Sequence, residues 1–246
     1  MNIAIIGYGN MGREIERISA AKGITVVSRI DKQQKDADFS EINKQSLKNA
    51  DVCIDFTSPD SVVNNVKKIA ELKKDMVIGT TGWYSNLEQV EKIVKSNGIG
   101  LVYGPNFSIG VNLFFKMVEN ASKLVNQFDD YDIFGYELHH NRKMDSPSGT
   151  AKALGKILLD NIKRKKTLAY DRIDRKIKQE ELHFASIRSG SIPGTHVIGF
   201  DSSADTIELK HTARNREGFA LGAVMAAKWI NGKKGIYSFE KIFEKL

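Results

Sequence analysis

The chain has little cysteine and proline and no long apolar run. Its single cysteine, Cys53, excludes a disulfide within the chain and any metal site built from several cysteines. Only 4 prolines occur among the 246 residues, so no proline-rich linker marks a domain boundary. No run of about 18 apolar residues is present, and we therefore expect no membrane span. Internal repeats and low-complexity segments are also absent.

The overall composition is that of a globular protein. Hydrophobic residues make up 41% and charged residues 27%, and the length suits one large or two smaller domains. The net charge of +7 favours anionic partners without choosing between nucleic acid and small molecules. We interpret the basic run "KRKK" (163–166) as a solvated loop, and we expect no nucleic acid because no zinc-finger, RNP or basic-zipper pattern accompanies it. The first residues, "MNIAIIGYGNMG", do not resemble a signal peptide, so we expect a cytoplasmic protein.

Strands and helices alternate in the first half of the sequence. Short apolar runs that end in glycine or polar residues predict strand-and-turn segments at 3–7, 24–31, 51–56, 76–82 and 99–106. Helices are predicted between them at 13–23, 61–73 and 86–96. This alternation is typical of an α/β fold with a Rossmann-type, doubly wound parallel sheet.

The pattern changes after about residue 108. Helices are predicted at 111–126, 151–162 and 218–230, the last followed by a short basic end. Strands cluster instead of alternating, and we predict them at 131–140, 182–190, 195–200 and 206–211. This clustering indicates a second domain of α+β type with a mixed, largely open sheet.

A glycine-rich loop joins the first predicted strand to the first predicted helix. The segment has the form G-x-G-x-x-G in the strand-to-helix context that dinucleotide binding requires. Gly7 permits the tight turn, Gly9 leaves room for a pyrophosphate, and Gly12 lets the helix pack closely. The N–H groups at the helix start are expected to bind the phosphates. The predicted cofactor residues of this loop are Gly7, Tyr8, Gly9, Asn10, Met11 and Gly12.

Asp31, at the end of the second predicted strand, is the expected partner of the adenosine ribose. An acidic residue there favours NAD, but the adjacent Lys32 suits the 2′-phosphate of NADP, so both cofactors stay open. Two further loops follow the fourth and fifth strands, at the edge where such sheets bind ligands, and we place the nicotinamide near them. Their residues are Gly79, Thr80, Thr81 and Gly82, and Gly104, Pro105, Asn106 and Phe107.

A second candidate site lies in "YELHHNRKMDSPSGTAKAL" (136–154). His139, His140 and Lys143 can handle protons and neutralise carboxylates. The sequence Ser148-Gly149-Thr150 then opens a helix whose free N–H groups suit a carboxylate. Each feature alone is more often structural, as a surface side chain or a helix cap. Their concentration within twelve positions, beside a dinucleotide loop, indicates a catalytic site.

We expect no metal at this site. Adjacent histidines on a strand point to opposite faces, and we identify no carboxylate at a useful spacing. The other three histidines, His183, His196 and His211, lie on predicted strands without a motif, and we expect them to be structural.

The chain closely resembles the 4-hydroxy-tetrahydrodipicolinate reductase family, also called dihydrodipicolinate reductases, of bacterial and plant lysine biosynthesis. The resemblance covers essentially the whole chain. It is carried by "ELHHNRKMDSPSGTA" (137–151), by the glycine loop, by "GTTG" (79–82) and by "NFSIGVN" (106–112), in the family's order.

The resemblance implies an NADH- or NADPH-dependent oxidoreductase that reduces a small cyclic dicarboxylate in the diaminopimelate route. It assigns catalytic proton transfer to His139 and Lys143, and substrate binding to His140, Gly149 and Thr150. Cofactor binding falls to the glycine loop, to Asp31 and to the two later loops, with a basic contact from Arg216. It also implies a homotetramer. The dinucleotide-binding domain would span 1–107, completed by 217–246, and the substrate-binding and oligomerisation domain would span 108–216.

Two other functions stay open on the residues alone. One is a different Rossmann dehydrogenase that acts on an amino acid such as aspartate or on another imine. The other is a regulatory module that binds a nucleotide without turnover. Lys143 and the two histidines disfavour the regulatory module, because a sensor has no need of a proton donor.

Overall fold

The computed structural model describes residues 1–243 and residue 245. The chain divides into two compact units, one formed by residues 1–109 with 216–246 and the other by residues 110–215. Among the described residues, no helix is long and apolar enough to cross a membrane.

The first unit contains a six-stranded sheet in which every described pairing is parallel. The strands follow the order β11-β5-β4-β3-β1-β2. This is the Rossmann-type sheet that the sequence predicts, and the prediction is confirmed. The strands are β1 (Asn2–Ile6), β2 (Thr25–Ile30), β3 (Val52–Asp55), β4 (Asp75–Ile78), β5 (Gly100–Tyr103) and β11 (Gly235–Ser238).

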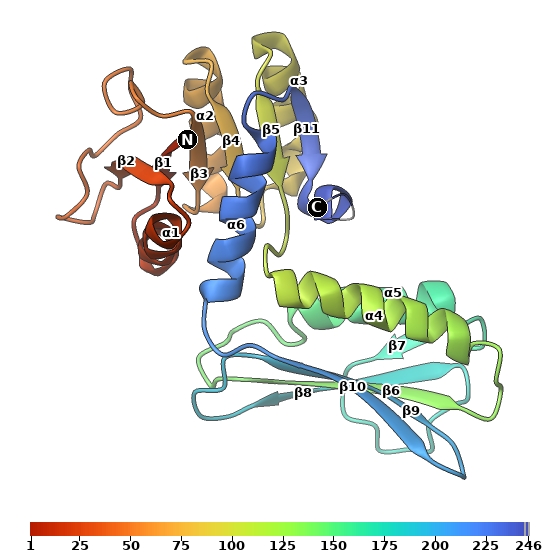
Figure 1. The fold of residues 1–246 in the computed structure, drawn as a ribbon. Coiled ribbons are helices and arrows are strands. Elements are labelled where there is room, and N and C mark those ends of the chain that lie inside the picture. The colour runs from red at the N-terminus through yellow and green to blue at the C-terminus, as the bar shows by residue number, and fades with distance from the viewer. Residues whose placement is uncertain (244, 246) are drawn as a thin grey trace. The chain divides into compact units, whose positions relative to one another are not determined.

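Helices cover both faces of this sheet (Figure 1). Successive side chains of a strand point to opposite faces, so Ile3 and Ile5 join one apolar cluster, whereas Ala4 and Ile6 join the other. The first cluster includes buried residues of α1 and α6, and the second includes those of α2 and α3. The helices are α1 (Asn10–Ala21), α2 (Pro59–Glu71), α3 (Leu87–Asn97), α6 (Glu217–Ile230) and α7 (Phe239–Phe243), with a 3₁₀ turn at Tyr84–Asn86.

The segment after α6 differs from the expected basic end. Residues 235–238 form β11, which pairs in parallel with β5 at one edge of the sheet, and α7 follows. Gly100 of β5 allows the close approach, because a Cβ there would lie 2.3 Å from the Lys233 carbonyl oxygen. The chain's last segment therefore completes the sheet.

The second unit is a five-stranded mixed sheet with helices on one face (Figure 1). Its strand order is β10-β9-β6-β8-β7; β6 and β7 pair in parallel with β8, whereas β9 is antiparallel to β6 and β10. The strands are β6 (Asp132–His139), β7 (Thr167–Ala169), β8 (Glu181–Arg188), β9 (Thr195–Asp201) and β10 (Thr206–Thr212). Helices α4 (Ile109–Val125) and α5 (Gly149–Asn161) pack through Phe114, Val118 and Leu154 on core residues such as Phe184.

The basic run at 163–166 is only partly the solvated loop that the sequence suggests. Lys165 is buried, and its Nζ donates to the carbonyl oxygens of Gln179 (2.8 Å) and Glu181 (2.7 Å) and pairs with Asp132 (2.6 Å). The interpretation was wrong for Lys165, because these oxygens replace water around the ammonium group.

Candidate active site

A groove in the first unit follows the carboxyl ends of β1, β3 and β4. It consists of two cavities of about 470 and 390 Å³ that share Gly7, Gly9, Phe56 and Thr57 in their linings. Open parallel sheets bind ligands at this edge. The smaller cavity brings the glycine loop together with the loop after β4, through Asn10, Met11, Gly12, Gly79, Thr80 and Thr81.

The glycine loop has the geometry of a phosphate cradle. Gly7 has a φ of 87°, a conformation that side chains disfavour, and a Cβ there would lie 2.3 Å from the Phe56 carbonyl oxygen. A Cβ at Gly12 would lie 2.4 Å from the Gly7 carbonyl oxygen, so α1 packs directly on the loop. Gly9 faces open space at the N-cap of α1. These residues therefore fit a dinucleotide pyrophosphate at the helix N-terminus.

Asp31 and Lys32 both line the larger cavity, together with Lys68 of α2. Asp31 Oδ2 accepts the Tyr8 backbone N–H at 2.8 Å, and Oδ1 accepts that of Gln33 at 2.8 Å. Burial alone would raise the pKa of Asp31, but the backbone donors outweigh burial and lower it. The carboxylate is therefore ionised and held in place beside two cationic side chains.

A buried carboxylate anchors the loops beneath the groove. Asp55, at the end of β3, accepts hydrogen bonds from the Thr57 hydroxyl (2.7 Å), from Asn65 (2.8 Å) and from the Thr80 hydroxyl (3.1 Å). Burial raises the pKa of Asp55. The Thr57 backbone also donates to the Thr80 hydroxyl at 2.8 Å, so the loops after β3 and β4 are linked.

The loop after β3 and one side of α2 also line the groove, although the sequence pattern did not indicate them. This segment contributes Phe56, Thr57, Ser58, Ser61, Asn64 and Lys68 to the larger cavity. The available signal was "DFTSPDS", in which a strand ends before a serine cap and a proline at the helix start.

Some predicted cofactor residues lie outside both cavities. The loop Gly104–Phe107 lines neither of them, and Phe107 is buried against Phe239 with ring centroids 4.5 Å apart. Tyr8 is also buried, and its hydroxyl donates to Glu16 while the Arg13 guanidinium lies 4.6 Å from its ring centroid. The Tyr8 side chain thus packs behind the glycine loop.

The residues that the sequence predicts to handle protons gather in the second unit at the carboxyl end of β6. His139 is the last residue of that strand and is 7% exposed. His140 is half-buried, and its Nδ1 has no hydrogen-bond partner among the described residues. Lys143 follows in a turn closed by its backbone N–H to the His140 carbonyl, and its Nζ pairs with Asp145 at 2.7 Å.

The start of α5 lies beside these residues. Ser148 is the N-cap, and its hydroxyl accepts the Ala151 N–H at 3.1 Å. Gly149 is exposed, and a Cβ there would meet only open space. Thr150 follows in the first turn. The start of this 13-residue helix is its positive end, and the Gly149 N–H there binds the Asp145 carboxylate.

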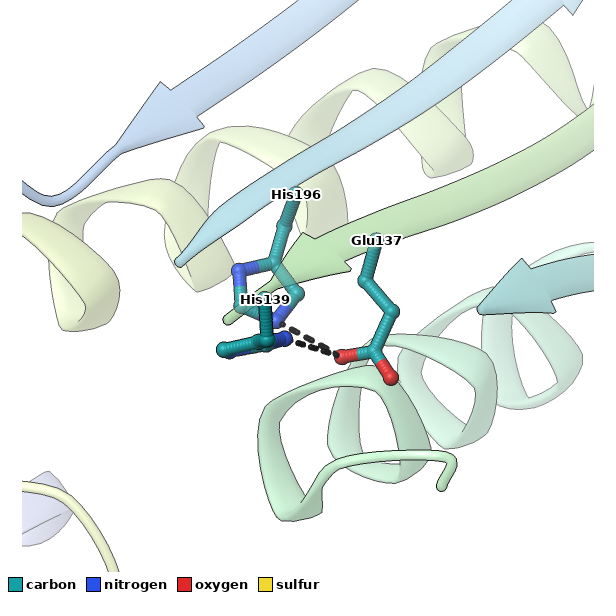
Figure 2. Close-up of side chains that lie close together, drawn as sticks. All are labelled: Glu137, His139 and His196. Atoms are coloured by element: carbon teal, nitrogen blue, oxygen red, sulfur yellow. Dashed lines mark ion pairs between the residues drawn. The ribbon is translucent and has the colours of Figure 1, made fainter. Parts of the chain in front are cut away.

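Two residues that the sequence interpretation passed over complete this site, Glu137 and His196 (Figure 2). Glu137 Oε2 lies 3.2 Å from His139 Nδ1 and 3.4 Å from His196 Nε2. The expectation that no carboxylate lies at a useful spacing was wrong, because residues i and i+2 of a strand share a face. The expectation that His196 is merely structural was also incomplete, because strand pairing sets it opposite Glu137.

Burial and charge shift the titration of this group. Burial lowers the pKa of His139 from 6.5 to about 4; Glu137 opposes that shift, whereas His196, Lys143 and Arg188 add to it. Burial alone would raise the pKa of Glu137, but His196, Ser148 and Arg188 outweigh it and hold the pKa far below its usual range. At neutral pH the site therefore holds a neutral His139 and an ionised Glu137.

The same three side chains have ligand atoms within 4.8 Å of one another, close enough for a metal ion to bridge. The surroundings disfavour a cation. Glu137 Oε1 already accepts hydrogen bonds from the Ser148 N–H (2.9 Å), the Ser186 hydroxyl (2.8 Å) and Arg188 (2.9 Å). A guanidinium at that distance would repel a metal ion, so we interpret the cluster as a hydrogen-bonded network.

The Rossmann-type sheet and its glycine-loop groove agree with a nicotinamide-dependent oxidoreductase. The chain belongs to the dihydrodipicolinate reductase family. The model of the family's N-terminal part matches residues 1–107, and that of its C-terminal part matches residues 110–243. It is thus a reductase of the diaminopimelate route of lysine biosynthesis.

Relatives of known name agree with this assignment. The chain is 35% identical to the 4-hydroxy-tetrahydrodipicolinate reductase of Christiangramia forsetii, over 100% of this chain and 99% of that protein. It is also 35% identical to the reductase of that name from Archaeoglobus fulgidus, over 99% and 100% of the two chains. Among solved structures, a dipicolinate-bound dihydrodipicolinate reductase from Paenisporosarcina sp. TG-14 has the same fold. The TM-score is 0.76 and the sequence identity 23%, and the match covers 98% of this chain and 99% of that chain.

Proposed function

We propose that the chain reduces 4-hydroxy-tetrahydrodipicolinate to tetrahydrodipicolinate with NADH or NADPH, and that the 4-hydroxyl group leaves as water. The observation that carries this proposal is the meeting of His139, Lys143 and the positive N-terminus of α5 at one end of β6. A small dianionic ring needs cationic and N–H donors for its carboxylates and an acid for its reduction.

The nucleotide binds along the groove of the first unit. The N–H groups at the start of α1 hold the pyrophosphate, and Gly9 leaves the space that it fills. Asp31 faces the adenosine ribose, with Lys32 and Lys68 beside it for a 2′-phosphate. This pairing of one fixed carboxylate with two cations supports the use of both NADH and NADPH. When bound, the nicotinamide supplies the hydride.

The substrate binds in the second unit. One carboxylate meets the N–H groups of Gly149 and Thr150 at the positive end of α5. His140 offers its unpartnered Nδ1, and the Lys143 ammonium neutralises charge on the same ring.

Lys143 is the proton donor in this proposal. Lys143 Nζ is already in an ion pair with Asp145, whereas a histidine whose pKa lies near 4 must first acquire a proton. His139 then acts as a neutral hydrogen-bonding group, and it takes up a proton once the dianion is bound nearby. The turn from His140 to Lys143 follows His139 directly, so His139 and Lys143 lie on one short segment of the chain.

The assembly is a homotetramer in this proposal, built through the second unit. Both helices of that unit lie on one face of its sheet, and the other face includes the partly exposed side chains of Phe134, Tyr136 and Leu138. Aromatic and aliphatic side chains at a sheet surface are typical of subunit interfaces. The dinucleotide-binding role belongs to residues 1–107 with 217–246, and the substrate-binding role to residues 108–216.

A coupled assay tests the reaction. The unstable cyclic substrate is generated in place by the preceding condensation, and oxidation of NADH and NADPH is followed at equal concentration. We expect substrate-dependent oxidation of both nucleotides. Nucleotide binding without oxidation would indicate a regulatory module, and oxidation with aspartate but not the cyclic substrate would indicate a different dehydrogenase.

A further inference from the structure

The Glu137 carboxylate contacts five other side chains, and the reaction does not itself require it. They are those of His139, Ser148, Ser186, Arg188 and His196. The side chain of Glu137 is fully buried on the helix-covered face of β6. Strand register places Ser186 of β8 and His196 of β9 on either side of it, in one row across three strands. Figure 2 shows both histidine rings turned toward this carboxylate. A buried charge with so many partners is fixed in position.

The first connection runs from Glu137 to the start of α5. Ser148 donates both its backbone N–H (2.9 Å) and its hydroxyl to the two carboxylate oxygens. Ser148 is the N-cap, so these bonds fix where the helix begins relative to β6. The N–H groups of Gly149 and Thr150, which we assign to the substrate carboxylate, are thereby placed by Glu137.

The second connection runs through Arg188 to the loop of Lys143. Arg188 Nη2 donates to Glu137 Oε1 at 2.9 Å and to the Asp145 carbonyl oxygen at 2.6 Å. Asp145 in turn pairs with Lys143 Nζ at 2.7 Å through its carboxylate. The guanidinium therefore ties the loop that holds the proton donor to the same carboxylate.

The third connection is to His139 itself. Its Nδ1 lies 3.2 Å from Glu137 Oε2, on the side of the ring away from Nε2. The two atoms are at ion-pair distance but do not form a hydrogen bond, so the contact is electrostatic and raises the pKa of His139 against the effect of burial. His196 packs edge-on to the His139 ring, with centroids 5.2 Å apart, and limits its rotation.

We propose that Glu137 is the positioning residue of the active site, holding His139, the Lys143 loop and the carboxylate-binding end of α5 in one arrangement. This inference rests on the proposed function for the roles of those three groups. The competing view is that Glu137 and Arg188 form a core ion pair that contributes to stability alone. The two views differ in what happens to turnover and to His139 in a folded variant.

The decisive variant is Glu137→Gln in the full-length protein, which keeps the shape of the side chain and removes its charge. We expect kcat to fall on the order of 10- to 100-fold, the usual effect of losing a partner that orients a working group. The KM for NADH should stay within about twofold of wild type, because the groove lies in the other unit. Dipicolinate, the ligand of the solved relative, should bind more weakly in a calorimetric titration.

The pKa of His139 gives a second readout, which reports the contact with Glu137 directly and is read together with kcat. With ¹⁵N-histidine labelling, we expect the pKa of His139 to fall below its wild-type value in Glu137→Gln, because Glu137 is the neighbour that raises it. The control is Glu119→Gln on α4, which removes a surface carboxylate paired with Lys116 and Lys123. It should leave kcat and the His139 signal unchanged.

A Glu137→Gln protein with near-normal kcat and an unchanged His139 signal would overturn the inference. If that variant does not fold, Arg188→Lys replaces it, since lysine keeps the charge but cannot bridge two acceptors in the same way. A folded Arg188→Lys protein with wild-type kcat would be equally contrary. An inactive wild-type protein would instead refute the proposed function, and the His139 titration would still test the positioning.

Discussion

Lys143 and Asp145 form an ion pair of 2.7 Å on the loop between β6 and α5. Burial alone would raise the pKa of Asp145, but Lys143 and the backbone N–H of Gly149 lower it by binding its carboxylate. A carboxylate of the protein thus contacts two of the groups that we assign to the substrate. In the proposed site, Asp145 would therefore compete with one substrate carboxylate for Lys143 and for the end of α5.

Asp145→Asn should bind dicarboxylates more tightly. Neutralising the side chain removes the competing negative charge, and an exposed ion pair contributes up to about 1 kcal/mol, or roughly fivefold in affinity. Calorimetric titration with dipicolinate measures the change. The matched control, Asp160→Asn, removes the similarly exposed partner of Lys156 elsewhere on α5 and should bind dipicolinate like wild type. Weaker binding by Asp145→Asn would show that Asp145 supports the site instead.

His139 should make the protein less stable in mild acid. The ring binds a proton near pH 6.5 when the chain is unfolded, but only near pH 4 when it is buried in the folded protein. Acidification from pH 6.5 to pH 4 therefore favours the unfolded chain, and it contributes no further loss below pH 4. The full effect is about 3 kcal/mol.

Urea unfolding of wild type and His139→Gln across this pH range measures that contribution. Glutamine does not titrate, so the free energy of unfolding of the variant should fall less steeply between pH 6.5 and pH 4. Equal slopes in the two proteins would contradict a strongly lowered pKa at His139.

Lys32 should govern the use of NADPH. It lines the larger cavity beside Asp31, where the 2′-phosphate of NADPH would lie. We expect Lys32→Ala to raise the KM for NADPH roughly fivefold, the value of one exposed ion pair, and to change that for NADH less than twofold. The control is Lys35→Ala, an exposed lysine nearby that lines neither cavity. Equal changes for the two nucleotides would place the 2′-phosphate elsewhere.

Local pattern was sufficient to predict the parallel sheet and the position of the glycine loop. Apolar runs mark β1 to β5, and Gly7 to Gly12 lies where a strand meets a helix. The edge strand β11 was missed because "GIYS" is short and pairs with β5, about 135 residues earlier in the chain. Such long-range pairing leaves no trace in a local window.

In the candidate site, too, local features could be predicted and long-range pairing could not. His139, His140, Lys143 and Ser148 to Thr150 are contiguous, so their concentration was visible in the sequence. Glu137 was within reach, since it lies two residues before His139 on the same face. His196 was not, because only the pairing of β6 with β9 sets it opposite Glu137.

The most direct test of the central claim compares wild type with Lys143→Ala in the coupled assay, together with nucleotide binding by fluorescence. The claim is that Lys143 delivers the proton for a hydride transfer, so kcat should fall by roughly 10² to 10⁴. The affinity for NADH should not change, and Lys156→Ala, on the exposed face of α5, should behave like wild type. Turnover near the wild-type value in Lys143→Ala would contradict the role of Lys143 and the account of the site built on it.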